Sequence, residues 1–375
     1  RGQLMALTKV DTSMVESSGA FGRRNILING DYGIYQRAQQ VTGLGAASEY
    51  YTADRWRIEG ASGISGRFTM TAGTEDAPAE SNVTTSLKLD CTTADTSLAA
   101  GEYLILQQLI EGQNLQHVKK GTSGAKQLTV SFWIKGNASA TYIAELYDAD
   151  NTRQISKTFA VTSSWSKVEI TYPADTTGAF GNDANLSLYL LIWIAAGSNY
   201  TSGTLNSSAW AAQTNANRAV GVSNFYSSTN NELYITAVQL EVGDTATEFE
   251  ILSYPERLTL CQRYYQKFGP YGTNTFPLGP ISYCYTATNH AVGHTLTTPL
   301  RAVPAVEVTG TLQMMGGRND GNNYGYDITS IFTIAIGNNS VMWNVVANTG
   351  AAPGSSPVVG GGSSTTFFAY DSELG

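Results

Sequence analysis

The sequence predicts an all-β protein in which a two-sheet antiparallel sandwich precedes a smaller C-terminal β-domain, with a short helix at the junction. Strand-length apolar runs separated by turn residues recur along most of the chain, and several alternate between apolar and polar positions, as in 167-KVEITY-172. Charged residues are 14% of the 375 residues, below the usual quarter, and there are 21 tyrosines. This composition is typical of a β-protein with a neutral, hydrogen-bonding surface. The lack of a fixed repeat period argues against a β-helix or a propeller.

The charge and the hydropathy pattern exclude some classes of partner. The net charge is −8, and no basic cluster is larger than a pair such as Lys119-Lys120. Nucleic acids and anionic membrane surfaces both require a positive surface. The longest apolar run, 186-LSLYLLIWIAAG-197, is shorter than the roughly 20 residues of a membrane span, so we expect a strand buried on both faces. We therefore predict no nucleic-acid partner and no membrane insertion.

The three cysteines, Cys91, Cys261 and Cys284, are too few and too scattered for a disulfide framework or a zinc site. They predict buried free thiols in a protein made in a reducing cytoplasm. No segment near the start resembles a signal peptide.

Residues 1–24 differ from the rest of the chain. Leu7, Val10, Met14 and Val15 have nearly helical spacing, but they are followed by small polar residues. So little apolar surface cannot fold alone. We expect an N-terminal arm that is either disordered or packed on another molecule, as an anchor or a trimer contact.

Residues 25–252 contain the runs that predict the sandwich. These runs are 55-RWRIEG-60, 66-GRFTMTAG-73, 86-SLKLDC-91, 103-YLILQQLI-110, 127-QLTVSFWIKG-136, 142-YIAELYD-148, 158-TFAVT-162, 167-KVEITYP-173, 186-LSLYLLIWI-194 and 233-LYITAVQLEVG-243.

Residues 253–375 form the second predicted domain. It begins with the helix-like stretch 255-PERLTLCQRYYQKF-268, in which Pro255 suits the first helical position and Glu256 the positive end of the helix dipole. The later runs are again β-like: 281-ISYCYTAT-288, 291-AVGHTLTTPLR-301, 305-AVEVTGTLQMM-315, 331-IFTIAIG-337, 340-SVMWNVVAN-348 and 366-TFFAYDSEL-374.

Several motifs in this order resemble those of phage and prophage tail-fibre-type proteins. They are 25-NILINGDYGIYQRA-38, 51-YTADRWRI-58, 130-VSFWIKG-136, 238-VQLEVGDTATEFE-250, 260-LCQRYYQKF-268, 298-TPLRAVPAVEV-308 and 367-FFAYDSEL-374. The resemblance implies a jelly-roll sandwich like that of carbohydrate-binding modules, followed by a small β-domain that is the receptor-binding tip. It further implies a homotrimeric virion tail protein that binds a surface polysaccharide or an outer-membrane component of the host and meets other tail proteins through the N-terminal arm.

The resemblance also implies that residues 25–35 lie beside residues 233–242. Many such modules hold a structural calcium ion there, and Asp31 and Glu241 are its candidate ligands in this chain. However, Thr236 and Ala237 stand where paired acids are expected. Two carboxylates are few for an ion that prefers six to eight oxygens, so we predict no cofactor.

Sugar recognition needs aromatic faces together with amides and carboxylates. Tyr50-Tyr51 are candidates, whereas Trp56, Trp133 and Trp193 lie in apolar strands and are expected in the core. Tyr200 and Trp210 lie in the long polar loop 197–221, and loops of this length are often functional. We predict that they bind glycan; the alternative is that they fix the loop to its own sandwich or to a neighbouring subunit.

The second candidate site is the turn-rich stretch 318-RNDGNNYGYD-327 of the C-terminal domain. The candidate receptor-binding residues are Arg318, Asp320, Asn322, Asn323, Tyr324 and Tyr326. The alternative is a solvated hairpin tip. Nearby, His290 and His294 would face one side of a strand and are expected to be ordinary surface or interface groups.

The motifs of common enzymes are not found in the sequence. Glu145, Asp148 and Asp150 lie close together, but Asp148 to Asn151 is typical of a hairpin turn. We therefore predict a non-enzymatic tail fibre that attaches to surface glycan. The alternatives are a structural connector of the virion, with the sandwich as a spacer, and a cellular carbohydrate-binding module.

Overall fold

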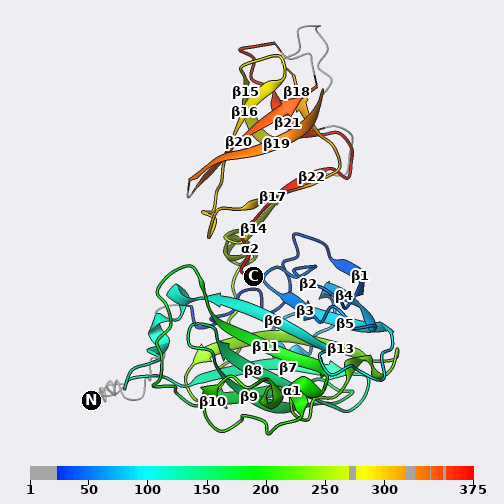
Figure 1. Ribbon diagram of the computed structural model, residues 1–375, viewed down its shortest axis with the longest axis vertical. Helices are drawn as coiled ribbons and strands as arrows, with labels where there is room; N and C mark the ends of the chain where they lie inside the picture. Colours follow the sequence, from blue (N-terminus) through cyan, green and yellow to red (C-terminus); the bar gives the residue numbers. More distant parts are fainter. Residues whose placement is uncertain (1–22, 270–275, 317–325, 338, 349–351) are drawn as a thin grey trace, which may run out of the picture.

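The computed structural model describes residues 23–269, 276–316, 326–337, 339–348 and 352–375. Figure 1 shows a large β-sandwich at one end and a small barrel at the other, with helix α2 (Tyr254–Gln262) between them. The predicted all-β class and the order of the two domains are confirmed.

One sheet of the sandwich has six antiparallel strands. Their order is β1 (Gln40–Leu44), β4 (Arg67–Thr74), β5 (Ser86–Thr93), β13 (Glu232–Val242), β7 (Leu128–Gly136) and β10 (Ser166–Tyr172).

The other sheet has seven antiparallel strands. Their order is β12 (Ala211–Ala212), β9 (Arg153–Val161), β8 (Ala140–Asp148), β11 (Leu186–Ala196), β6 (Tyr103–Glu111), β3 (Arg57–Gly60) and β2 (Ser48–Glu49). Short helices occupy the loops: α1 (Ser198–Thr201) and the 3-10 turns η1 (Ala79–Ser81), η2 (Gly112–Asn114), η3 (Gln116–Val118), η4 (Asn215–Asn217) and η5 (Phe225–Ser227).

The core of this jelly-roll sandwich lies between the two sheets, where alternate residues of each strand point inward. On β11, Leu188, Leu190 and Ile192 belong to this core, whereas Leu191 and Trp193 belong to a second apolar cluster on the opposite face. The prediction that this strand is buried on both faces is therefore confirmed.

The segment 25–35 lies beside β13, as the resemblance implied. Ile26 N donates to Leu240 O (2.8 Å), and Val238 N donates to Gly30 O (2.9 Å). A Cβ at Gly30 would lie 2.1 Å from the Val238 carbonyl oxygen, so only glycine allows this close approach. The segment does not form a regular strand, because Asn29 and Tyr32 have positive φ angles and bend the chain.

Helix α2 begins with a capping box between Ser253 and Glu256 and carries proline in its first turn. The predicted helix was too long. It ends at Gln262, and Tyr265–Phe268 is strand β14, which pairs with β22 (Phe367–Asp371). β22 also pairs with β17 (Ala305–Thr309), giving a three-stranded sheet.

The C-terminal barrel is closed. Its strands follow the order β15 (Phe276–Cys284), β16 (Asn289–Thr295), β20 (Ser340–Ala347), β19 (Tyr326–Gly337), β18 (Leu312–Met315) and β21 (Val358–Gly361). Cys284 lies in this domain and Cys91 and Cys261 lie outside it; all three are buried and free, as predicted. Within the described ranges, no helix has both the length and the apolarity to cross a membrane.

The last residues of the chain attach the C-terminal part to the sandwich. The carboxylate of Glu373 contacts the guanidinium of Arg55, and Asp371 pairs with Arg37 at 2.8 Å. The Tyr50 hydroxyl donates to Leu374 O (2.6 Å), so this tyrosine serves the junction.

Candidate functional site

The outer face of the seven-stranded sheet carries a groove of about 310 Å³. This size falls at the lower end of typical ligand sites. The lining residues come from β3, β6, β8 and β11 and from the loop that follows β11. They are Glu59, Tyr103, Ile105, Gln107, Tyr147, Tyr189, Leu191, Trp193, Tyr200, Gln213, Asn215 and Arg218.

The loop 197–221 forms one wall of the groove and is held firmly in place. Gly197 N donates to Glu102 O (2.7 Å) where the loop begins, and Ala219 N donates to Tyr200 O (2.9 Å) across it. Trp210 is buried, and its indole N–H donates to Pro173 O (2.9 Å). The wall is therefore preformed, which reduces the entropy lost when a ligand binds.

Aromatic rings form the floor and one end of the groove. The ring centroid of Tyr200 lies 5.3 Å from that of Trp193 and 5.2 Å from that of Tyr103. Tyr147 and Tyr189 form a second pair, 5.5 Å apart. These separations are those of favourable aromatic pairs, so the rings hold each other in fixed orientations.

Arg218 ties the loop to the sheet. Its Nε donates to both carboxylate oxygens of Glu145, at 2.9 and 3.2 Å, and Glu145 also accepts the indole N–H of Trp193 (2.5 Å). The guanidinium carbon lies 4.9 Å from the Trp193 ring centroid and 5.2 Å from that of Tyr147. Burial raises the pKa of Glu145, and the Arg218 charge opposes this shift.

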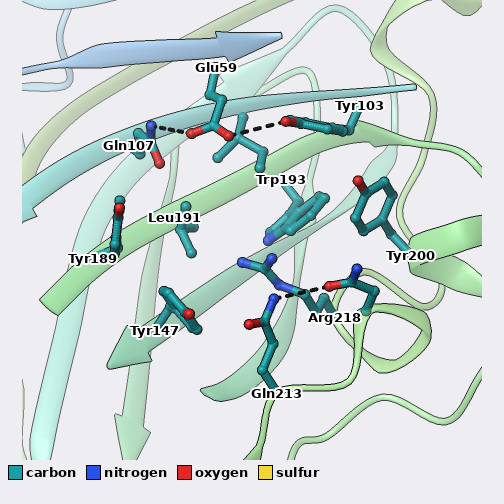
Figure 2. A pocket seen from close by; sticks show the side chains of 12 residues that line it. Glu59, Tyr103, Gln107, Tyr147, Tyr189, Leu191, Trp193, Tyr200, Gln213 and Arg218 are labelled. Carbon is teal, nitrogen blue, oxygen red and sulfur yellow. Dashed lines mark hydrogen bonds between the residues drawn. The ribbon is translucent and has the colours of Figure 1, made fainter. Parts of the chain in front are cut away.

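Glu59 and Gln107 face Arg218 and Gln213 across the groove, with Trp193 between them, as Figure 2 shows. Glu59 accepts hydrogen bonds from Gln107 Nε2 (2.6 Å) and from the Tyr103 hydroxyl (3.1 Å). The pKa of Tyr103 is raised to about 12, mainly by burial and to a smaller extent by the negative charge of Glu59. This tyrosine therefore stays a neutral donor.

Gln107 is fully buried, and its Oε1 has no hydrogen-bond partner among the described residues. A buried acceptor without a protein partner is costly, so such an atom needs a donor from a water molecule or a ligand. The side chain lines the groove, where a ligand hydroxyl would supply that donor.

The structure brings one predicted glycan-binding residue, Tyr200, into the groove. The expectation that Trp210 is an exposed binding residue is wrong. It is 9% exposed and fixes the loop to its own sandwich. Tyr326 is 4% exposed in the barrel core, which does not fit a surface contact. Arg318, Asp320, Asn322, Asn323 and Tyr324 lie outside the described residues.

Sequence reasoning missed most of the groove. Trp193 was expected in the core; it is indeed buried, but it lies on the outer face and lines the groove. Trp56 is in the core, as predicted, whereas Trp133 is only partly buried. The sequence signal that could have indicated the groove is the pair of outward positions Ile105 and Gln107, because a buried glutamine interrupts the apolar pattern there.

Asp31 and Glu241 do not fit the calcium site that the resemblance implied. The Asp31 carboxylate contacts the guanidinium of Arg257, which places a positive charge where the ion would lie. Glu241 accepts bonds from Gln239 and from both the backbone and hydroxyl of Thr247. No cluster of three or more metal-ligating side chains occurs in the described part of the chain.

Comparisons with known proteins identify no family. No protein-family model matches this chain, and no curated protein matches it. Among solved structures, the chain is similar to the enzymatically active domain of bacteriophage CBA120 tailspike protein 4, with 11% identity, a TM-score of 0.30, and coverage of 58% of this chain and 21% of that chain.

Two carbohydrate-binding modules show similar scores. TmCBM61 in complex with β-1,4-galactotriose has 12% identity and a TM-score of 0.29, with coverage of 59% of this chain and all of the module. The CBM22-1 xylan-binding domain of Paenibacillus barcinonensis Xyn10C has 12% identity and a TM-score of 0.27, with coverage of 60% of this chain and all of the module. Similarity at this level carries no argument about function. Any argument about function must therefore rest on the residues of the groove.

Proposed function

We propose that this chain binds a neutral glycan, without catalysis, in the groove on the outer face of the seven-stranded sheet. The observation that carries this proposal is the combination of aromatic faces with hydrogen-bonding groups in one preformed groove. The partly exposed rings of Tyr200 and Tyr147 suit the apolar faces of a sugar, and the buried Oε1 of Gln107 suits a hydroxyl donor.

The charge balance of the groove favours a neutral ligand over an acidic one. The positive charge of Arg218 is already offset by Glu145, which lies against it. Glu59, whose side chain is 28% exposed, adds a negative charge on the opposite wall. Arg57 Nη1 lies 3.8 Å from a carboxylate oxygen of Glu59 and offsets that charge in turn. An acidic sugar would thus meet a groove whose cations are already paired, and it would lose hydration energy without gaining a free cation.

The carboxylates in and near the groove favour binding without catalysis. Glu145 is fully buried, and its two oxygens are engaged by Arg218 and Trp193. It therefore lacks access to a glycosidic bond, and Glu59 is the remaining carboxylate among the lining residues. Hydrolysis of glycosides ordinarily requires two carboxylates that flank the scissile bond.

The sequence motifs support assigning this binding activity to a phage tail fibre that attaches to the host surface. We propose that the fibre is a homotrimer, so that several weak groove contacts act together and give firm attachment. A virion connector with the sandwich as a spacer, or a cellular carbohydrate-binding module, would need no such multivalent contact with a host cell.

The test is isothermal titration of the full chain with neutral and acidic oligosaccharides of equal length. We expect saturable binding of a neutral glycan, and a Kd about tenfold weaker for Tyr200→Ala, equivalent to about 1.4 kcal/mol. Tyr254→Ala is the matched control, because Tyr254 is 57% exposed on α2, outside the groove. The proposal fails if no glycan binds, or if both variants weaken binding equally.

Cell adhesion separates the fibre from its alternatives. Saturable binding of the chain to host cells, inhibited by the same neutral glycan, supports the fibre. Glycan binding without cell binding favours the cellular module, and the absence of both favours the connector.

A further inference from the structure

A second pocket, of about 260 Å³, lies between the start of the sandwich and the C-terminal end of helix α2. Its walls come from three parts of the chain that are far apart in the sequence: residues 23–28, the turns η2 and η3, and residues 260–264. It shares no lining residue with the groove on the seven-stranded sheet, so it is a separate site. Its volume is slightly below the usual range for ligand sites and suits a small molecule.

One wall of this pocket is apolar. Ile26 and Ile28 are buried, and Leu260 of α2 is partly buried. Ile28, Leu260 and the ring of Tyr264 pack in one apolar cluster, which fixes their positions. This wall suits the apolar body of a ligand rather than a fully hydrated ion.

The lining residues also include three basic side chains and no carboxylate. Two of the basic side chains supply no free charge at pH 7. Nε and Nη2 of Arg263 donate to the two carboxylate oxygens of Glu111, at 3.0 and 2.8 Å. Loss of hydration lowers the pKa of His117, so its ring is largely neutral.

Arg23 supplies the free positive charge of the pocket. Its Nε donates to Asn25 O (2.8 Å), and its Nη2 donates to Ile26 O (3.2 Å) and Leu27 O (2.7 Å). These carbonyl oxygens hold the guanidinium in place without neutralising its charge. Its Nη1 donates no hydrogen bond in the described part of the chain, and the side chain remains open to solvent, so a ligand can reach it.

Nearby groups compensate the charge of Arg23 only in part. Loss of hydration lowers the pKa of Arg23, and the negative charge of Glu250 opposes this shift without cancelling it. The Arg263 carbonyl group at the end of α2 would repel an anion, but it already accepts a hydrogen bond from Arg301 N (2.8 Å). An anion beside Arg23 would therefore supply the favourable interaction that this cation lacks.

We propose that this pocket binds a small organic anion that consists of a carboxylate on an apolar body about the size of one ring. The carboxylate would accept a charge-assisted hydrogen bond from Arg23 Nη1, and the apolar body would pack against Ile28, Leu260 and Tyr264. This proposal does not rest on glycan binding, because the two sites have no residue in common.

The experiment is a ligand-observed NMR titration of the full chain with three probes at equal ionic strength: benzoate, its neutral analogue benzamide, and acetate. We expect saturable binding of one benzoate per chain, at least tenfold tighter than the binding of either other probe. Benzamide that binds as tightly as benzoate would show that charge is not recognised. Acetate that binds as tightly would show that the apolar wall is not used. Either result would overturn the proposal.

Variants locate the benzoate in the pocket. Arg23→Gln should weaken its binding at least tenfold, whereas Arg23→Lys, which keeps the charge, should weaken it less than threefold. Arg24→Gln is the matched control, because Arg24 is the neighbouring arginine but does not line the pocket. This variant should bind benzoate like the natural chain.

A further variant covers the case in which Arg23→Gln loosens the backbone that Arg23 holds. Asn114 is exposed at the rim, so Asn114→Phe should fill the pocket and abolish benzoate binding while the thermal unfolding profile is kept. The proposal is overturned if benzoate does not bind saturably, if Arg23→Gln and Asn114→Phe both leave binding unchanged, or if Arg24→Gln weakens binding as much as Arg23→Gln.

Discussion

Replacing Arg218 by leucine tests whether the groove wall is held by a buried ion pair. Arg218 is 13% exposed at its side chain and pairs with Glu145, whose side chain is 0% exposed. Removing one partner of a buried pair leaves an uncompensated charge, which costs about 3–5 kcal/mol. Because Arg218 retains some solvent contact, we expect Arg218→Leu to lower the free energy of unfolding by about 3 kcal/mol at pH 7, near the lower end of that range.

The pH dependence identifies the cause of this loss. Without Arg218, burial alone acts on Glu145 and raises its pKa further above that in the unfolded chain. The folded variant then binds a proton more tightly than the unfolded chain does. Its deficit should be largest at pH 7 to 8 and shrink as the pH falls through the raised pKa toward the unfolded value of the carboxyl.

Calorimetric unfolding of four proteins completes the test: the natural chain, Arg218→Leu, Glu145→Gln, and the double variant. In Glu145→Gln the new amide oxygen would still accept the Trp193 indole N–H, but the side chain carries no charge. The double variant should therefore recover at least half of the stability that Arg218→Leu loses. Equal losses in Arg218→Leu and in the double variant, or a deficit independent of pH, would refute the ion-pair explanation.

Three further predictions concern other parts of the molecule. Gln107→Leu should weaken glycan binding about fivefold while lowering the free energy of unfolding by only about 1 kcal/mol, because Oε1 has no protein partner to lose and the lost Nε2 hydrogen bond joins the partly exposed Glu59; a loss of about 3 kcal/mol or more in calorimetry, or unchanged glycan binding, would contradict this. Burial lowers the pKa of His294 to about 4, whereas a histidine of the unfolded chain has a pKa of about 6.5. The stability that depends on His294 being neutral is therefore fully present above about pH 6.5 and should be lost as the pH falls through 4. Denaturant unfolding should show about 2 kcal/mol less acid loss in His294→Gln, and equal acid loss in both proteins would contradict the prediction. Glu373→Gln should cost about 3 kcal/mol, since Arg55 is almost fully buried and would lose its carboxylate; an unchanged melting temperature would contradict it.

The fold could be predicted from local patterns wherever one face of a strand is buried and the other is polar. The stretch 167–172 alternates in sequence and is strand β10, and the turn after Asp148 joins β8 to β9. The prediction was wrong at Tyr265–Phe268, which continues the helical pattern. This segment pairs with β22, about 100 residues later in the sequence, and local propensity contains no information about that pairing.

The two histidines of the barrel also show that local sequence does not predict structure set by distant strands. The spacing of His290 and His294 correctly placed both on one side of β16, but not on the protein surface. His290 is fully buried, and the His294 Nδ1 lies 3.1 Å from the Tyr370 hydroxyl. Which face of a strand points inward depends on how the barrel closes, and that closure is set by strands far apart in the sequence.

The site could be predicted only in part, because the sequence does not show which side an aromatic side chain faces. Tyr200 was found because an aromatic residue in a polar loop is conspicuous, yet the same reasoning selected Trp210, which anchors the loop instead. Trp193 was assigned to the core because its strand is apolar on both faces. In such a strand the sequence does not distinguish the face that packs on the second sheet from the face that lines a groove.

The most direct test of the proposed function is a crystal structure of the chain with its tightest-binding neutral oligosaccharide. We predict sugar rings packed against Tyr200 and Tyr147, with one hydroxyl donating to Gln107 Oε1 and the loop 197–221 unmoved. An oligosaccharide bound elsewhere on the molecule, with the groove left to solvent, would contradict the account.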